Sequence, residues 1–421
     1  MQNYDIWQSS SGFVTGLSIE SISSYVRDLS SSCSALLLVE DLLFAGSHDG
    51  LLVSWDASSG VERWRVSIDG PISDFSLDLD TLFVTSSDSL YSIDVSDGSI
   101  LWNRELEGAS DYVVALDGIV WATSSVYELE VADFIENTVW RFDADGKELE
   151  RWDISEKPWH IGLDKEGSLL LGIGLPRCGV AKISSGEKRL QFILKPLSTY
   201  ENGYDIRRSP VTCGDCSADF FYAPGPYSKS PEEENWVWEN DPQLTKRLSF
   251  GVTGSDVTAV KSTGFGFVYG TSTGFYYYSG CEGTGAITKD GLVIQGNRTD
   301  LVKINGSIDA VAGLGTSIWL SYYDSRDSRP SHQHKIGLFR EITQDDTYRE
   351  NGKHHFIPHD SRIRLMDSSD DILVMGDEQG RVFVIESEVA QRRIDFPSFS
   401  EPRNDPKESE LRARLRMLRN R

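Results

Sequence analysis

The sequence predicts an all-β protein folded as a single β-propeller, most simply one of eight blades. The first observation is a recurring phrase, LLVSWDASSGVERW at Leu51–Trp64 and SLYSIDVSDGSILW at Ser89–Trp102. The second is its period, because the turn glycines of successive copies lie 38, 48 and 40 residues apart, and short strands repeating every 40 residues or so are typical of propellers. The third is that successive residues of each copy alternate with the period of two that is typical of a β-strand. The glycines are Gly60, Gly98, Gly146 and Gly186.

Each element of the repeat has a physical role. Leu51, Val53 and Trp55 follow the period of two that marks a strand, and the nearly continuous apolar character suits a strand covered on both faces. Gly60 supplies the positive φ that a tight hairpin commonly needs. Trp64 returns on the next strand, where we expect it to pack against the following blade and bury a large apolar area.

The same pattern divides most of the chain into strand-turn modules. They lie near 34–68, 72–106, 112–154, 158–195, 208–250, 256–305, 308–358 and 362–396. The count gives eight blades, and seven if one irregular module is an insertion. The fifth and seventh modules are the least regular, and we expect insertions there. The segment GFVTGLSIE at Gly12–Glu20 could supply a strand that closes the ring beside the last blade and removes its exposed sheet edges.

Two propeller families resemble these repeats. GSHDGLLVSWD at Gly46–Asp56 is similar to the second half of a WD40 repeat, although the Gly-His dipeptide that usually opens such repeats is missing from every module. DSLYSIDVSDGSILW at Asp88–Trp102 is similar to the repeat of pyrroloquinoline-quinone (PQQ) type propellers, in which a Leu-Tyr-x-Ile/Leu-Asp strand precedes Gly and Trp. The resemblance implies the fold and leaves the activity open, because propellers host many unrelated functions.

Length, composition and charge limit the classes of protein to which the chain can belong. A propeller of 421 residues is one domain, so we divide the chain into an N-terminal segment (1–33), the propeller (34–396), a linker (397–406) and a tail (407–421). No run approaches the ~20 apolar residues of a membrane span, and the start lacks the pattern of a secretory signal, so we expect a cytoplasmic protein. Five scattered cysteines favour reduced thiols. The net charge of −24 repels nucleic acid and anionic lipid and indicates either a solvated acidic surface or a basic partner.

The C-terminus departs from the β pattern. Within KESELRARLRMLRNR, leucines recur at helical spacing and arginines cover most of the remaining surface, giving a net charge of +4 over Lys407–Arg421. The sequence therefore predicts a basic amphipathic helix. It could fold back onto the acidic propeller, dock to a protein partner, or bind RNA or an anionic membrane. The candidate contact residues are Leu411, Arg412, Arg414, Leu415, Arg416 and Arg419.

Three further features are candidates for a site. Cys213 and Cys216 have the CxxC spacing of a metal pair, and His355 and His359 have i, i+4 spacing on what we expect to be a long exposed insertion. Pro358 argues against a helix there. These four are candidates for metal ligands, although the prediction is no metal. Trp236 and Trp238, on an acidic segment, could form an apolar patch for a basic partner or pack between blades.

Together these features predict a non-catalytic interaction scaffold that binds proteins through propeller-face loops and the basic tail. A quinoprotein dehydrogenase of the propeller type should have a signal peptide, calcium-binding carboxylates and, in many members, adjacent cysteines, and this chain has no Cys-Cys pair. It also lacks a P-loop and an HExxH motif. We therefore expect no cofactor and no catalytic residue. The alternatives are a cofactor- or metal-dependent propeller enzyme and a subunit of an RNA-containing particle.

Overall fold

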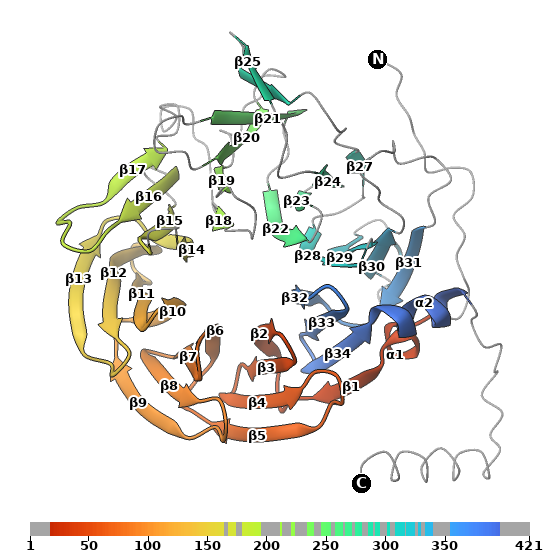
Figure 1. The fold of residues 1–421 in the computed structure, drawn as a ribbon, viewed down its shortest axis with the longest axis horizontal. Helices are drawn as coiled ribbons and strands as arrows, with labels where there is room; N and C mark the ends of the chain where they lie inside the picture. Colours follow the sequence, from red (N-terminus) through yellow and green to blue (C-terminus); the bar gives the residue numbers. More distant parts are fainter. Residues whose placement is uncertain are drawn as a thin grey trace.

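The computed structural model describes residues 17–163, 167–173, 179–194 and 308–395, the last range with gaps at 316, 325–326, 330–332 and 340–353. Between 195 and 307 it describes only strands β18 to β27, with the side chain of Ala259 alone among theirs, and the side chains of 179–180, 192–194 and 354 are likewise not described. These parts form eight sheets arranged in a ring (Figure 1). The prediction of an eight-bladed propeller is confirmed.

The first four blades each consist of four antiparallel strands in sequence order from the centre outward. Blade one contains β2 (Cys33–Val39), β3 (Leu42–Ser47), β4 (Leu51–Asp56) and β5 (Glu62–Ser67). Blade two contains β6 (Ile72–Asp78), β7 (Thr81–Ser86), β8 (Ser89–Asp94) and β9 (Ile100–Glu105). Blade three contains β10 (Ala109–Leu116), β11 (Ile119–Glu128), β12 (Asp133–Asp143) and β13 (Glu148–Ile154). Blade four contains β14 (Pro158–Leu163), β15 (Leu169–Ile173), β16 (Gly179–Ile183) and β17 (Gln191–Leu194).

The second half of the ring repeats this order with two changes. Blade five contains β18 (Val211–Thr212), β19 (Phe220–Ala223), β20 (Glu234–Glu239) and β21 (Lys246–Thr253). Blade six contains β22 (Val257–Thr263), β23 (Gly266–Thr271), β24 (Gly274–Ser279) and β27 (Leu301–Lys303). The intervening β25 (Gly285–Thr288) and β26 (Gly291–Ile294) join the edge of blade five. Blade seven contains β28 (Ile308–Leu314), β29 (Ser317–Tyr323), β30 (His334–Phe339) and β31 (His354–His359). Blade eight contains β32 (Ile363–Ser368), β33 (Ile372–Asp377), β34 (Arg381–Glu386) and the N-terminal β1 (Tyr25–Asp28).

The ring closes through β1, which pairs antiparallel with β34. The prediction of a closing strand at Gly12–Glu20 was wrong in its position. The described part of that segment instead enters the short helix α1 (Ile19–Ile22), because Ser18 and Ser21 form a reciprocal capping box that starts a helix. Two side chains of β1 also bind blade one. The Tyr25 hydroxyl donates to the Ala57 carbonyl at 2.6 Å, and Arg27 Nε donates to the Gly60 carbonyl at 3.0 Å.

The predicted packing of the repeat tryptophans between blades is confirmed. Trp64 Nε1 donates to the Val95 carbonyl of the next blade at 2.7 Å, and its ring lies so close to Gly98 that a Cβ there would stand 2.6 Å from it. Gly98 also has a φ of +76°, so the turn needs glycine for two reasons. Trp102 and Trp152 repeat the contact one and two blades further on.

The described core consists of apolar clusters shared by neighbouring blades rather than one central core. Between blades one and two, Phe44 and Trp64 pack with Leu82, Val84 and Tyr91. Between blades seven and eight, the cluster also includes Ile19 and Ile22 of α1 and two residues of α2 (Ser387–Asp395). Each blade therefore depends on its neighbours, as expected of a repeat architecture.

The insertions predicted in the fifth and seventh modules fall on links 224–233 and 340–353, which lie outside the described residues. The sixth module carries an additional hairpin that was not predicted, β25–β26, between its third and fourth strands. In blade three, β11 and β12 run for 10 and 11 residues, against 6 for the corresponding strands of blades one and two. Sequence reasoning missed this extension.

The last described element is α2 (Ser387–Asp395), which follows β34. The basic helix predicted over Lys407–Arg421 lies outside the described residues. Among the described residues, no helix is long and apolar enough to span a membrane.

Candidate functional site

The two faces of the ring follow from the strand order. Because the four strands of a blade are antiparallel, the links between second and third strands all reach one face, which we call the b–c face. The links from the outer strand of one blade to the inner strand of the next reach the same face. The turns between first and second strands reach the opposite face. Loops on such faces carry binding functions in many folds, since a rigid scaffold positions them.

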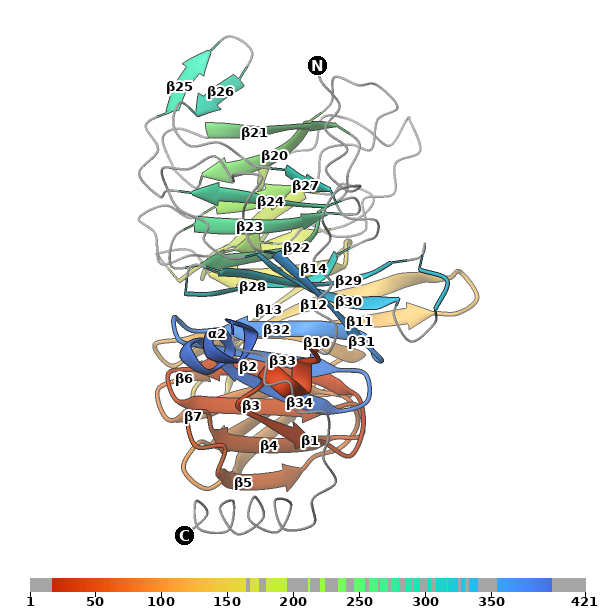
Figure 2. The same cartoon turned by 90° about the vertical axis from the view of Figure 1, so that its right-hand side faces the viewer.

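A hairpin of blade three projects from the b–c face, as Figure 2 shows for β11 and β12. The pairing of β10 with β11 ends at Ser125, and that of β12 with β13 begins at Asn137. Residues 126–136 therefore extend beyond their sheet as a two-stranded ribbon, in which Val126 pairs with Glu136, Tyr127 with Phe134 and Glu128 with Asp133. We call residues 126–136 the blade-three hairpin.

The blade-three hairpin exposes apolar side chains at its end. Leu129 is 83% exposed and Val131 is 61% exposed, both in the turn between the strands. Ile135 and Tyr127 are also exposed. Ala132 completes the turn with a φ of +54°, a left-handed conformation that residues with a Cβ seldom adopt. An exposed turn is normally polar or rich in glycine, so folding alone does not explain two large aliphatic side chains there.

The surroundings of these apolar side chains are acidic. Glu130, Asp133 and Glu136 are exposed and Glu128 is half-buried, while the hairpin contains no lysine, arginine or histidine. Four carboxylates within 11 residues give this projection a local charge of −4. The hairpin therefore combines an apolar tip with a negative flank, a combination that suits a partner with apolar and basic groups side by side.

The base of the hairpin is held by a buried cation. Lys157, in the link between blades three and four, places Nζ 2.6 Å from Asp111 Oδ1 and 3.0 Å from Ser125 Oγ. The same Nζ lies 4.2 Å from the centre of the Phe134 ring, close enough for a cation–π contact. Burial holds the pKa of Lys157 below its ordinary value, although the Asp111 carboxylate acts in the opposite direction.

Aromatic rings extend this support into the hairpin. Phe134 packs edge-on against Tyr127 at 5.0 Å and against Trp159 of β14 at 5.9 Å. Trp159 is itself anchored, because its carbonyl accepts a hydrogen bond from the Tyr112 hydroxyl at 2.6 Å. The projection is thus braced against blade four at one end and free at the other.

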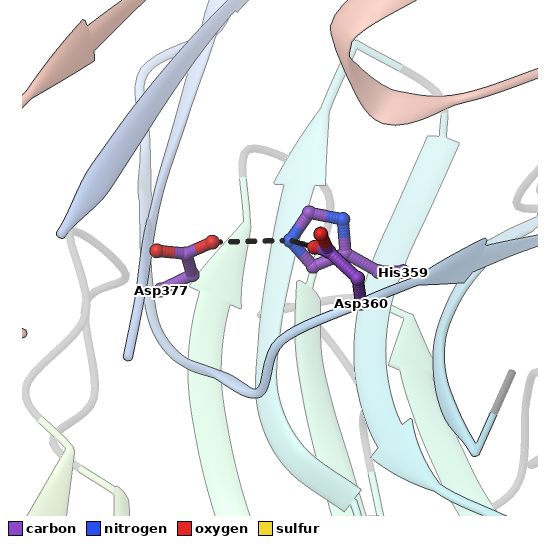
Figure 3. A group of neighbouring side chains, drawn as sticks. All are labelled: His359, Asp360 and Asp377. Atoms are coloured by element: carbon purple, nitrogen blue, oxygen red, sulfur yellow. Dashed lines mark hydrogen bonds and ion pairs between the residues drawn. The ribbon is translucent and has the colours of Figure 1, made fainter. Parts of the chain in front are cut away.

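A second group on the b–c face brings together His359, Asp360 and Asp377 (Figure 3). His359 Nε2 lies 3.2 Å from Asp377 Oδ2 and 3.9 Å from Asp360 Oδ1. The His359 side chain is buried, since β31 places it against the turn that follows β33. The prediction of an exposed insertion at this position was therefore wrong: His355 and His359 lie on the outer strand of blade seven. His355 is not part of this group.

An arginine fills the centre of this group. Arg381 Nε donates to Asp377 Oδ2 at 2.7 Å, and its Nη2 donates to Asp360 Oδ1 and lies 3.2 Å from His359 Nε2. Backbone amides of Gln379 and Arg381 donate to the other Asp377 oxygen. Burial alone would raise the pKa of Asp377, but hydrogen bonds from His359 and Arg381 outweigh it and hold that pKa below its usual range. The guanidinium already supplies the positive charge that a metal ion would bring, so the donor set does not fit a metal site.

The GxSxG spacing occurs once, at Gly270–Gly274, but in the wrong structural context for a hydrolase nucleophile. That motif requires a strand followed by a sharp turn into a helix. Here it joins the end of β23 to the start of β24 within a hairpin of blade six. The motif therefore lies between two paired strands and not between a strand and a helix.

The remaining predicted site residues are only partly placed. Cys213 and Cys216 lie outside the described residues, as does the tail with Leu411, Arg412, Arg414, Leu415, Arg416 and Arg419. Trp236 and Trp238 lie on β20, the third strand of blade five, where only the backbone is described. No described contact joins any of these residues to the blade-three hairpin.

Comparisons with known proteins agree with the architecture. The family model described as outer membrane protein assembly factor BamB matches residues 5–122, which end within the third blade. None of the curated proteins matches the sequence.

Solved structures resemble the chain over most of its length. The computationally designed protein Ika8 is similar with a TM-score of 0.58 and 14% identity, over 86% of this chain and 98% of that one. BamB from Moraxella catarrhalis is similar with a TM-score of 0.54 and 13% identity, over 86% and 97%. The Cps50 (Swd1) β-propeller domain from Myceliophteria thermophila gives 0.48 and 11%, over 86% and 98%. Together with the repeats and the eight sheets, the likenesses to Ika8 and BamB show that the chain has a β-propeller fold.

Proposed function

We propose that this protein is a non-catalytic scaffold that binds other proteins across its b–c face. The observation that carries the proposal is the blade-three hairpin, whose exposed Leu129 and Val131 have no packing role in the described fold. Large apolar side chains that project into water are a common mark of protein interfaces. A rigid ring bearing such a projection can bind a partner with little rearrangement of its own.

Two other observations support a binding role. The described cluster with the donor types of a metal site is neutralised by Arg381, which favours a structural purpose for it. The matching family model is named for an assembly factor, and assembling proteins requires contact with them. Under this proposal, Trp236 and Trp238 and the basic tail at Lys407–Arg421 are additional contact sites, and a cytoplasmic location is part of the same prediction.

The test is affinity isolation from native cell extract with the full chain as bait, in parallel with a chain ending at Ser400 and with nuclease-treated samples. We expect one or more proteins to be retained in stoichiometric amounts by the full chain and to survive nuclease. Loss with the shorter chain would assign the contact to the tail, and loss with nuclease would replace this proposal by an RNA-containing particle. Absence of any stoichiometric protein would contradict the scaffold function.

A further inference from the structure

We infer that the blade-three hairpin is an anchor that inserts its Leu129–Val131 tip into an apolar pocket rimmed by lysine and arginine on a partner protein. The inference rests on the proposed function and specifies the chemistry of the partner. Sequence patterns did not indicate this site.

The apolar part of the partner follows from the tip. Leu129 and Val131 are separated by one residue in a four-residue turn and are both mostly exposed. Their side chains leave water only if something outside the described fold covers them, and burial of such side chains is the main favourable contribution at interface centres. Because the tip projects from the face, the surface that covers it must be concave.

The basic rim follows from the flank. Glu128, Glu130 and Asp133 surround the tip, with no cation in the hairpin to neutralise them. A nucleic acid or an anionic lipid surface would be repelled by these carboxylates. Lysine and arginine around the pocket would complement them, speed the encounter and exclude acidic competitors. A protein surface is therefore the occupant that the charges favour.

Insertion is favoured over addition of a partner strand. The unpaired edges of the hairpin are short, since only Val126–Glu128 on one strand and Asp133–Glu136 on the other lie beyond their sheet. The bulge between Val126 and Tyr127 also interrupts the register that an added strand would follow. Meanwhile Lys157, Phe134 and Trp159 hold the base of the hairpin in place. A braced ribbon with a free apolar end is preorganised to insert, which lowers the ordering cost of binding.

The chain's own basic tail is a competing occupant with similar chemistry. The last described helix, α2, lies on the opposite side of the ring from the hairpin (Figure 2). The tail would have to cross from one face to the other over the 11 residues between Asp395 and Lys407. We therefore favour a separate protein and make the tail an outcome of the test.

The first step of the test is site-specific crosslinking. A photoreactive amino acid replaces Val131 in the full chain, and in a matched control it replaces Leu79, which is 84% exposed in a turn on the opposite face. Both proteins are irradiated in native extract, and the crosslinked peptides are identified by mass spectrometry. We expect an adduct at position 131 that is absent at 79 and that maps to a partner surface with apolar residues flanked by lysine or arginine.

The second step measures affinity with that partner purified. We expect Leu129→Ser to weaken binding about 10- to 100-fold, as loss of an interface anchor does. Leu79→Ser should leave affinity unchanged, and both variants should keep the wild-type melting temperature. The triple variant Glu128→Gln, Glu130→Gln, Asp133→Asn should bind more weakly at low salt and lose most of the salt dependence.

Several outcomes would overturn the inference. An adduct to residues 407–421 would assign the surface to the chain's own tail, and an adduct to lipid or nucleotide would refute a protein partner. Equal adducts at 79 and 131 would show that the tip has no special role. A protein that full-length bait retains with unchanged affinity after Leu129→Ser would refute the anchor while leaving the scaffold function intact, so the two failures are distinguishable.

Discussion

Arg381 shows how one residue can convert a potential metal site into a structural joint. Its guanidinium contacts Asp377 on β33, Asp360 in the link to blade eight, and Glu20 on α1. The Asp377 side chain is fully buried, so removing the cation would leave a carboxylate in a medium that disfavours its charge. Arg381 therefore acts on stability rather than on chemistry.

We expect Arg381→Met to lower the free energy of unfolding by about 3 kcal/mol, because breaking a buried ion pair from one side leaves the other charge uncompensated. The measurement is urea denaturation followed by tryptophan fluorescence. The matched control is Arg364→Met, which removes an arginine paired with Glu378 on the surface and should cost less than about 0.5 kcal/mol. Equal losses for the two variants would show that the buried cluster contributes nothing special.

Asp74 links two inner strands and makes the stability of the fold depend on pH. Its Oδ2 accepts the backbone N–H of Val113 at 3.0 Å, which joins β6 to β10. Burial raises the pKa of Asp74 to about 7, although the amides of Val113 and Phe75 oppose the shift. In the unfolded chain an aspartate has a pKa of roughly 4. At pH values between that pKa and the folded-state pKa, the folded state binds more protons than the unfolded state. This carboxyl therefore lowers the stability of the fold as the pH rises through that range.

Asp74→Asn should remove this effect while keeping the hydrogen bond from Val113. We expect the variant and the wild type to have similar unfolding free energies near pH 4. The variant should become the more stable by about 1–3 kcal/mol at pH 8. Urea denaturation at a series of pH values gives the difference directly. A difference that stays constant with pH would mean that Asp74 does not titrate in this range.

The blade-three hairpin depends on a few contacts at its base. Lys157 contacts both Asp111 and the Phe134 ring, and its side chain is only 10% exposed. The pair ties blade three to the link with blade four, whereas residues 129–132 extend beyond these contacts. The position of the tip is therefore set at the base.

Lys157→Met should lower the free energy of unfolding by about 2 kcal/mol, because the partly buried Asp111 carboxylate would lose its cation. Hydrogen exchange of residues 126–136 should accelerate more than that of blade one. The double variant with Asp111→Asn should lose less than the sum of the single losses, since the two residues act as a pair. Additive losses, or exchange that is unchanged in the hairpin, would show that the pair does not brace it.

Elements that depend on local pattern could be predicted from the sequence, and those that depend on distant partners could not. Trp64 and Gly98 belong to one repeat and its neighbour, so their contact follows from the period. The burial of His359 depends on Asp377 and Arg381, which two other strands supply. The extension of β11 and β12 gave only a weak signal in the sequence: the turn Leu129–Ala132 contains no glycine, proline, asparagine or aspartate. An expectation of regular four-stranded blades does not use this signal.

The stability of the propeller depends on closing the ring. β1 supplies the outer strand of blade eight from the opposite end of the chain. Its Tyr25 packs against Gly60 in the same way that Trp64 packs against Gly98. The same closing contact thus recurs with tyrosine in place of tryptophan. Sequence reasoning foresaw a closing strand but placed it too early, because Gly12–Glu20 looks more strand-like than the short YVRD segment that actually pairs.

The closure can be tested at Arg27, which pairs with Val382 in the β1–β34 ladder and reaches Gly60 through its side chain. Arg27→Ala should remove only the side-chain bonds and cost about 1 kcal/mol. Arg27→Pro should cost about 3 kcal/mol or more, because proline cannot donate to the ladder and would expose the edge of β34. Thermal unfolding gives the stabilities, and light scattering should show concentration-dependent association for the proline variant alone. If both variants behaved alike, the ring would not depend on β1 for its closure, and the contacts of α1 and α2 would have to hold its ends together.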